Sequence, residues 1–351
     1  MDARTPALDR ELSAPSLAAP AFVARAPWWG GDLQTLRNFL LRESADLSDW
    51  PAERLELPMA DGSGDRLVAS LHWPEGADGK PLAVLVHGLT GCEDSSYVRA
   101  TARHLLGLGY GVLRLNLRGA GPSRPLCLGQ YHAGKTEDLR DALQALRGLR
   151  PALLERGLLL VGYSLGANML LKFLAERAAG FPVLAAAAVS APIDLKAAQV
   201  RIMEPRNAVY HHYLLSRMKA EASAAPTVDS EAERESIRKL RTVYEFDEQR
   251  VAPSGGFAGA DDYYRRCSAR QFLAAIAVPT LVVHALDDPW IPAEPYVSYD
   301  WSKAEAIMPL LSSGGGHVGF HGSDSWAPWH NRRIADFFAT FSAGRSTAGL
   351  A

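Results

Sequence analysis

The chain has 351 residues, of which 48% are hydrophobic and 22% are charged, and its formal net charge is −2. This composition is typical of a soluble globular protein. The near-neutral charge excludes a global basic field, so neither nucleic acid nor an anionic membrane surface is an expected partner.

The cysteines and the N-terminal segment bear on the compartment. The three cysteines, none of which has a close metal-ligand spacing to another, are Cys92, Cys127 and Cys267. An odd, small number argues against a disulfide framework and favours a reducing cytoplasm. Residues 1–26 are rich in Ala and Pro, lack the pattern of a signal peptide, and are expected to be poorly ordered. Apolar runs stay well short of about 18 residues, so we predict no integral membrane segment.

In chain order, an amphipathic segment that begins at Pro27 is expected to pack on the body of the protein. Residues 54–58 and 66–73 flank a Gly- and Asp-rich turn, which predicts an antiparallel hairpin. Strands and helices then alternate, which predicts an α/β fold with a mainly parallel central sheet and helices on both faces. The expected strands are 82–87, 111–115, 157–161, 183–189, 278–284 and 306–310, and the expected helices are 96–108, 136–149, 167–176 and 327–341.

One long segment, residues 195–275, interrupts this alternation. It is rich in charged residues and helix formers and lacks the apolar runs of buried strands. We interpret it as a helical cap or lid inserted over the C-terminal edge of the sheet, between core segments 27–194 and 276–345. Its aromatic residues and paired histidines could shape an acyl pocket, although simple packing is the favoured interpretation; they are Tyr210, His211, His212, Tyr213, Tyr263 and Tyr264.

The pentapeptide Gly162-Tyr163-Ser164-Leu165-Gly166 has the pattern of a nucleophile elbow. It lies between an apolar, strand-like run and a helix-like stretch, which is the context that this motif requires. The turn is so tight that side chains larger than glycine at positions 162 and 166 would collide with neighbouring elements. Ser164 is therefore the candidate nucleophile.

A serine nucleophile needs a base and an orienting acid, which follow it in the order Ser, Asp or Glu, His in such folds. Asp287 and Asp288 both follow the strand 278–284, and Asp288 is favoured because it lies four residues before Pro292. His317, in the glycine-rich loop 312–319, is the candidate base, with His321 as its rival. Both aspartates could instead merely form a turn.

The oxyanion that forms during acyl transfer must be stabilised by fixed donors. The expected donors are the backbone N–H groups of Leu165, directly after the nucleophile, and of Leu89, in the loop after the first buried strand. His87 at the end of that strand is expected to brace the loop by hydrogen bonds. The glycine turn 118–123 lacks a phosphate-binding fingerprint, and no metal or organic cofactor is expected.

Together, segments 86–91, 116–121 and 162–168 and the loops of Asp288 and His317 resemble the α/β-hydrolase superfamily. Segments 32–36 and 131–138 are similar to the YheT-like branch of esterases and lipases, which is related to the eukaryotic ABHD lipid hydrolases. The resemblance covers residues 27–342 and implies a carboxylester hydrolase with Ser164, Asp288 and His317 as its triad. Asp32 stands where that branch is expected to have histidine.

The sequence thus predicts a hydrolase for small-molecule esters, with short, medium or lipid-like acyl chains, that works through an acyl-enzyme. One alternative is acyl transfer to an alcohol or lysolipid, although no histidine has the His-x-x-x-x-Asp spacing of acyltransferases. The other is a catalytically silent relative that binds ligands, against which the complete set of Ser, Asp and His argues.

Overall fold

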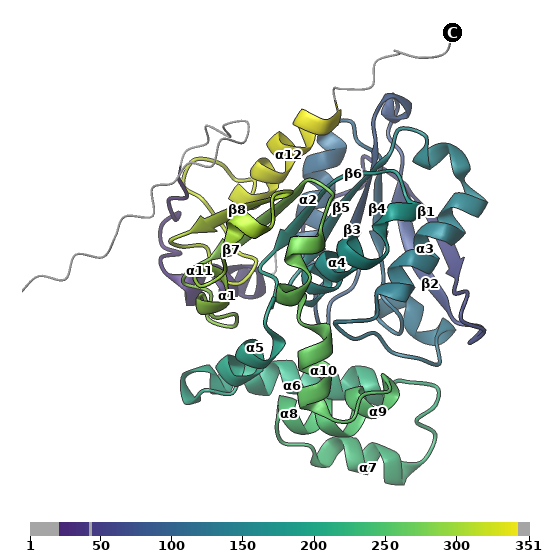
Figure 1. Ribbon diagram of the computed structural model, residues 1–351, viewed down its shortest axis with the longest axis vertical. Coiled ribbons are helices and arrows are strands. Elements are labelled where there is room, and N and C mark those ends of the chain that lie inside the picture. The colour runs from purple at the N-terminus through teal and green to yellow at the C-terminus, as the bar shows by residue number, and fades with distance from the viewer. Residues whose placement is uncertain (1–20, 42–43, 343–351) are drawn as a thin grey trace, which may run out of the picture.

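A central eight-stranded sheet organises the structure, a computed structural model that describes residues 21–41 and 44–342. The strand order is β1-β2-β4-β3-β5-β6-β7-β8, and all neighbours are parallel except β1 with β2 and β2 with β4 (Figure 1). The strands are β1 (Ala52–Pro58), β2 (Arg66–His72), β3 (Leu82–Val86), β4 (Val112–Leu115), β5 (Leu158–Tyr163), β6 (Val183–Val189), β7 (Thr280–Ala285) and β8 (Ile307–Ser312). The predicted hairpin and the mainly parallel sheet are confirmed.

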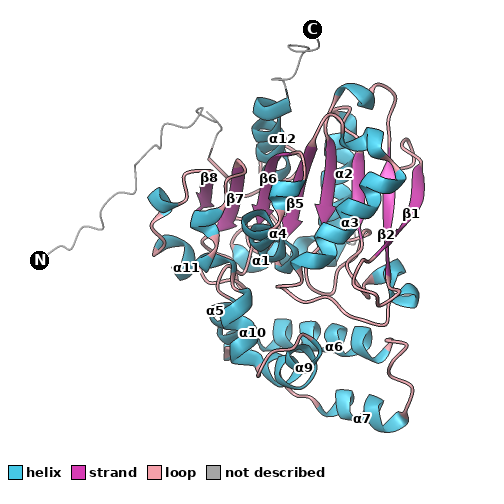
Figure 2. Ribbon diagram, turned by 45° about the vertical axis from the view of Figure 1, so that its right-hand side comes forward, coloured by secondary structure: helices cyan, strands magenta, loops and turns pink. Residues whose placement is uncertain are grey.

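Helices cover both faces of this sheet (Figure 2). One face packs on α3 (Thr136–Leu149) and α4 (Leu165–Glu176), and the other on α2 (Ser96–Gly107) and α12 (Trp329–Ser342). Side chains along a strand alternate between the two cores, so Leu82 and Val84 of β3 face α3 and α4 while Ala83 faces α2. Burial on both faces explains why these strands read as continuous apolar runs in the sequence.

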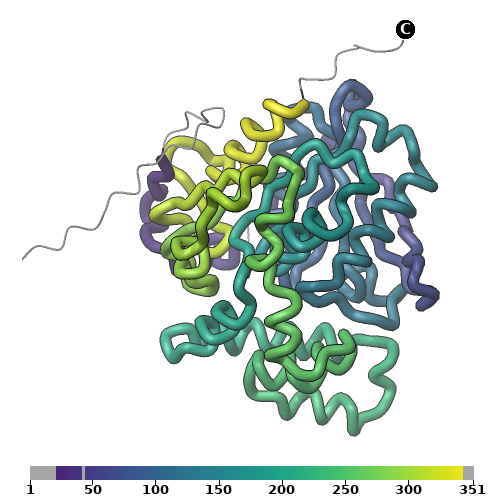
Figure 3. Tube along the Cα trace, viewed as in Figure 1, coloured from purple at the N-terminus to yellow at the C-terminus, as the bar shows by residue number. Residues whose placement is uncertain are grey.

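Between β6 and β7 the chain leaves the sheet and forms a group of helices, which we call the insertion (195–275). Figure 3 shows this segment leaving the core below the sheet edge and returning to it. Its helices are α5 (Leu195–Ile202), α6 (Ala208–Ser223), α7 (Glu231–Lys239), α8 (Val243–Phe246), the π-helical turn Asp247–Val251, α9 (Ala252–Ser254) and α10 (Ala260–Cys267). The insertion has an apolar core of its own, built mainly from α6, α7 and α8.

The N-terminal part of the described chain is tied to the end of the core. Residues 1–20 lie outside the described residues, so the expected disorder applies to them only as a prediction. For residues 21–26 the expectation is wrong, because Ala24 forms a β-bridge with Gly322 and the Arg25 N–H donates to the His321 carbonyl. The paired residues lie near opposite ends of the chain, so no local sequence pattern predicts that they form backbone hydrogen bonds. Helix α1 (Gly31–Leu41) follows and packs beside the loop that carries His317.

Candidate active site

Ser164 occupies a strained turn between β5 and α4. Its backbone angles are φ 50° and ψ −122°, in a region that non-glycine residues rarely adopt. A Cβ atom at Gly162 would lie 2.7 Å from Ala167 Cα, and one at Gly166 would lie 2.2 Å from the His87 carbonyl oxygen. Both contacts are too short for real atoms, so the two glycines are the residues that let the elbow approach α4 and the loop after β3. The strained turn leaves the Ser164 side chain partly exposed.

Two hydrogen bonds connect Ser164, His317 and Asp288 in a line. His317 Nε2 lies 3.0 Å from Ser164 Oγ, and His317 Nδ1 lies 2.8 Å from Asp288 Oδ2. A carboxylate accepts hydrogen bonds, so Nδ1 carries the proton and Nε2 is free to accept from the serine hydroxyl. Burial raises the pKa of Asp288, but the adjacent His317 outweighs this and keeps the pKa below its ordinary value. This arrangement suits a base that takes the Ser164 proton.

The two neighbouring aspartates have different positions. Asp288 is 3% exposed, and its Oδ1 accepts the N–H groups of Trp290 and Ile291 at 2.8 and 3.0 Å. These bonds, made within one tight turn, orient the carboxylate toward His317. Asp287 instead accepts the Gly316 N–H at 2.9 Å, and burial raises its pKa. Asp287 therefore holds the glycine-rich loop, whereas Asp288 touches the imidazole.

The loop that carries His317 is also fixed by α1. The His317 N–H donates to Thr35 Oγ1 at 2.8 Å, and the buried Gln34 accepts the His321 N–H at 2.7 Å. The rival histidine, His321, makes no contact with Ser164 and lies beside Arg37 instead. Burial and that neighbouring charge lower the His321 pKa to about 3. The segment 32–36, quoted above for its family resemblance, thus positions the candidate base.

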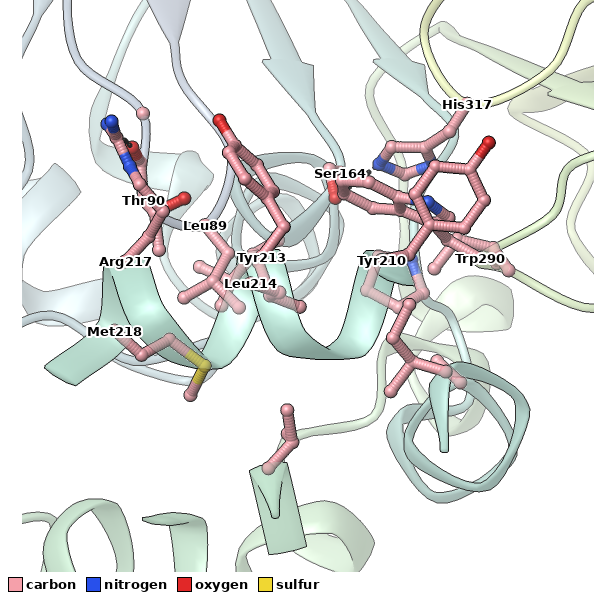
Figure 4. Close-up of a pocket in the computed structure, with 18 of the residues that line it drawn as sticks. Leu89, Thr90, Ser164, Tyr210, Tyr213, Leu214, Arg217, Met218, Trp290 and His317 are labelled. Carbon is pink, nitrogen blue, oxygen red and sulfur yellow. Dashed lines mark hydrogen bonds between the residues drawn. The ribbon is translucent and has the colours of Figure 1, made fainter. Parts of the chain in front are cut away.

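Trp290 is a contact of His317 that the sequence reasoning missed. Its ring stacks on the imidazole with centroids 4.5 Å apart and planes 23° apart, and it meets Tyr210 of α6 edge-on at 5.6 Å. Figure 4 shows both aromatic rings beside Ser164 and His317. A signal existed in the sequence, because Trp290 lies two residues after Asp288 in the same turn, but a turn alone does not tell which way a side chain points.

The two expected oxyanion donors are free to act. In the described part of the chain, the N–H groups of Leu89 and Leu165 donate to no protein acceptor. Their neighbours are occupied, since the Gly88 N–H donates to Tyr97 Oη at 3.0 Å and the Thr90 N–H donates to Tyr131 Oη at 2.7 Å. A Cβ atom at Gly88 would lie 2.9 Å from Ser164 Cβ, so this loop passes directly beside the nucleophile.

Helix α6 of the insertion holds the same loop from the other side. Tyr131 Oη, which accepts the Thr90 N–H, itself donates to Glu221 Oε2 at 3.1 Å. Arg217, one turn earlier on α6, donates to the Thr90 carbonyl at 3.2 Å. Thr90 has a φ of 56°, a conformation that is strained for a residue other than glycine. The hydrogen bonds of its N–H to Tyr131 and of its carbonyl to Arg217 hold it in this conformation. Burial raises the Glu221 pKa to about 7, although the hydrogen bond from Tyr131 acts to lower it.

A cavity of about 510 Å³ opens onto Ser164 and His317. The insertion supplies much of its wall, and Figure 4 shows Leu214 and Met218 of α6 beside Leu89 of the core. The tyrosines at 210, 213, 263 and 264 all line this cavity. Tyr210, Tyr263 and Tyr264 are also buried in apolar clusters, so they pack in the protein interior and line the cavity at the same time. Of the paired histidines, His211 accepts the Val243 N–H within the insertion, and His212 is exposed.

Other candidate residues have structural partners. His87 bridges two loops, since its Nδ1 donates to the Gly88 carbonyl and its Nε2 accepts the Leu117 N–H. Burial lowers the His87 pKa to about 4, so the ring stays neutral. Within residues 21–41 and 44–342, no three His, Cys, Asp or Glu side chains are grouped so as to hold a metal ion. None of the helices described there has the length and apolarity that a membrane crossing needs.

Comparison of the sequence with known proteins shows the family to which the chain belongs. The family model described as "alpha/beta hydrolase fold" matches residues 81–324, which include all three residues of the Ser164–His317–Asp288 line. The chain belongs to the α/β-hydrolase family. YheT of Escherichia coli K12 is 34% identical over 326 residues, an alignment that covers 90% of this chain and 92% of that protein. The hydrolase is therefore a member of the YheT-like branch.

Relatives with named activities are esterases and lipases. Monoacylglycerol lipase of Saccharomyces cerevisiae is 29% identical over 284 residues, covering 78% of this chain and 62% of the lipase. Phospholipase ABHD3 of Homo sapiens is 26% identical over 246 residues, covering 70% of this chain and 59% of the phospholipase. Among solved structures, the Pyrococcus furiosus esterase Pf2001 matches 86% of the chain at a TM-score of 0.58 and 16% identity, which shows the shared fold. The hydrolase is an enzyme of the esterase and lipase type.

Proposed function

We propose that the hydrolase cleaves carboxylic esters through a covalent acyl-enzyme on Ser164. His317 Nε2 takes the Ser164 proton while Oγ attacks the ester carbonyl, and Asp288 holds the imidazole and stabilises its charged form. His317 then donates the proton to the leaving alcohol. Water, activated by the same histidine, attacks the acyl-enzyme and releases the carboxylic acid. The three side chains that carry these steps already lie within hydrogen-bonding distance of one another.

The backbone N–H groups of Leu89 and Leu165 stabilise the oxyanion in both steps. They come from two different loops, one after β3 and one at the start of α4, and neither is used by another acceptor in the described residues. Fixed donors of this kind stabilise the developing negative charge without reorganising at the moment of reaction. Leu165 also begins a helix, whose positive end favours an anion.

The observation that carries this proposal is the hydrogen-bonded line Ser164–His317–Asp288 at the wall of a 510 Å³ cavity with apolar side chains. A cavity of that volume accommodates a small molecule. We assign it an ester with a short or medium acyl chain, or a lipid-like chain, because the relatives named above are a lipase and a phospholipase.

The test is a p-nitrophenyl ester series of increasing acyl length, with Ser164→Ala as the control. The wild-type enzyme should turn over the esters with an optimum at a chain length that fits the cavity, and its Ser164 should react with a fluorophosphonate probe. The variant should lose both reactions. Full activity in Ser164→Ala would disprove the assignment, and an unlabelled, inactive wild-type protein would favour a silent ligand-binding relative.

Acyl transfer is a second candidate, because another relative carries both activities in its name. The Saccharomyces cerevisiae protein named medium-chain fatty acid ethyl ester synthase/esterase 2 is 30% identical over 290 residues, covering 74% of this chain and 62% of that protein. The same acyl-enzyme serves both reactions if an alcohol replaces water. Product analysis with and without added ethanol separates them, since only transfer produces an ethyl ester.

The insertion (195–275) is assigned the role of a lid over this site. Its helix α6 forms one wall of the cavity. Arg217 of α6 contacts the loop of Leu89 and Thr90, which we call the oxyanion loop, and Glu221 reaches that loop through Tyr131. Access to Ser164 then depends on how this helix is seated. A fluorescent label on the exposed residue Ser216 should report a change in its surroundings when the cavity is filled by a phosphonate ester.

A further inference from the structure

The insertion contributes a buried carboxyl group, Asp247, to the cavity wall, outside the Ser164–His317–Asp288 line. Asp247 begins the π-helical turn Asp247–Val251 of the insertion and is 6% exposed. Its Oδ2 accepts the Tyr264 hydroxyl at 2.6 Å, while its Oδ1 accepts no hydrogen bond in the described residues. Burial raises the Asp247 pKa to about 7, and no basic side chain counters this effect.

A second polar group on the same wall lacks a partner. Gln199 of α5 is 8% exposed and lines the cavity. Its Nε2 donates to the Met203 sulfur at 2.7 Å, and its Oε1 is a buried acceptor without a partner among the described residues. A buried acceptor that is left unsatisfied destabilises the folded state, so it calls for a partner that the protein itself does not supply.

Gln199, Asp247 and Tyr264 line the same cavity, and α5 and the π-helical turn both pack against α10, which carries Tyr264. π-Helical turns of this kind are rare and occur frequently at functional sites. If the cavity received only hydrocarbon, Gln199 Oε1 and Asp247 Oδ1 would find no hydrogen-bond partner in it. The side chains present instead offer acceptors to a ligand.

We propose that Gln199, Asp247 and Tyr264 form a subsite that binds a hydroxyl group carried by the ester substrate. The proposal rests on the ester-cleaving function assigned above and narrows its substrate class to hydroxylated esters. A hydroxyl donates its one proton to the unpaired Gln199 Oε1, and its oxygen accepts a hydrogen bond from the Asp247 carboxyl in its protonated form. The hydroxyl can belong to the acyl chain or to the alcohol, because both parts of an ester extend from Ser164 into the cavity.

Two matched pairs of substrates test the subsite and distinguish these sources. The first pair is p-nitrophenyl hexanoate and its ω-hydroxy derivative, and the second is propyl hexanoate and glycerol monohexanoate. Wild-type enzyme should hydrolyse the hydroxylated member of one pair with a kcat/KM at least about tenfold higher. Gln199→Leu and Asp247→Leu should reduce that ratio to near one, and Tyr264→Phe should reduce it in part.

The matched control is Asp261→Asn, an exposed carboxyl on α10, which should leave the ratio unchanged. Fluorophosphonate labelling of Ser164 and turnover of p-nitrophenyl butyrate by the wild-type enzyme and by Asp261→Asn test the catalytic assignment apart from the subsite. Equal kcat/KM within both pairs, or a preference that survives in folded Gln199→Leu, would overturn the subsite. A stronger preference for the ω-amino derivative would overturn the assignment of a hydroxyl.

Discussion

The core and the insertion contribute to the site in different ways. In the core, each residue of the Ser164–His317–Asp288 line lies in a tight turn after a strand, and further hydrogen bonds from Asp287, Thr35 and nearby backbone groups fix those turns. In the insertion, helix α6 lines the cavity mainly with apolar side chains, contacts Thr90 through Arg217, and contacts Tyr131 through Glu221. We infer from this difference that, in the proposed reaction, the core breaks the ester bond and the insertion selects the ester.

The largest expected effect comes from a substitution in the core, at the candidate triad acid. Asp288→Asn should lower kcat by about 10⁴-fold with the fold intact, because an amide cannot hold the imidazole in the tautomer that accepts the Ser164 proton. Asp287→Asn should cost far less, about tenfold, since it only weakens the bond to the Gly316 N–H. Steady-state kinetics on one p-nitrophenyl ester measures both. Equal and small losses would show that neither aspartate is the triad acid.

A smaller effect is expected where the two regions meet. Tyr131→Phe removes the acceptor of the Thr90 N–H and the donor to Glu221, so the oxyanion loop loses its connection to α6. We expect kcat to fall about tenfold with little change in KM, because the loop acts on the transition state. Ser216→Ala on the same helix is the control. A raised KM with unchanged kcat would instead place Tyr131 in substrate binding.

The pH dependence of stability tests the insertion separately from the core, because the buried carboxyl of Asp247 belongs to the insertion. Burial raises the pKa of Asp247 to about 7, so the folded state holds that proton more tightly than the unfolded chain, where Asp titrates near 3.9. Its contribution to the free energy of unfolding is thus complete below about pH 4 and is lost as the pH rises to about 7. Glu221 acts in the same direction.

Asp247→Asn should therefore flatten the fall in stability between about pH 4 and pH 7, by at most about 4 kcal/mol. Urea unfolding of the wild type and the variant across that range measures the difference. An unchanged slope would mean that water or a neighbouring group already satisfies the carboxylate in the folded protein.

The smallest expected effect concerns Asp32, the position at which the resemblance led us to expect histidine. Asp32 accepts the Tyr210 hydroxyl at 3.0 Å and pairs with Arg206 at 3.0 Å, so it joins α1 to α6. Both charged side chains are about half exposed, and such pairs contribute about 0–1 kcal/mol. Asp32→Asn should lower the melting temperature slightly and change kcat/KM less than about threefold. A loss as large as that of Tyr131→Phe would show that α1 and α6 act together in catalysis.

Much of the fold and of the candidate site could be predicted because it depends on local rules. The elbow at Ser164 requires glycines at 162 and 166 for steric reasons that hold in any sequence context. Continuous apolar runs indicate strands buried on both faces, and their alternation with helices restricts the sheet to a mainly parallel order. The carboxyl ends of parallel strands share one edge of the sheet, and the turns of Ser164 and Asp288 both follow such strands.

Other features depend on contacts between segments that are far apart in the chain, and only the tertiary structure decided them. The sequence determined that an Asp and a His follow Ser164, but folding decided that Asp288 faces His317 while Asp287 holds Gly316. No periodicity in the sequence predicts the other long-range contacts of the site. These are the stacking of Trp290 on His317, the hydrogen bond from the His317 N–H to Thr35, and the polar cavity wall at Gln199 and Asp247. Local sterics set the chemistry of the elbow, whereas the shape of the cavity depends on long-range packing, which no short pattern in the sequence encodes.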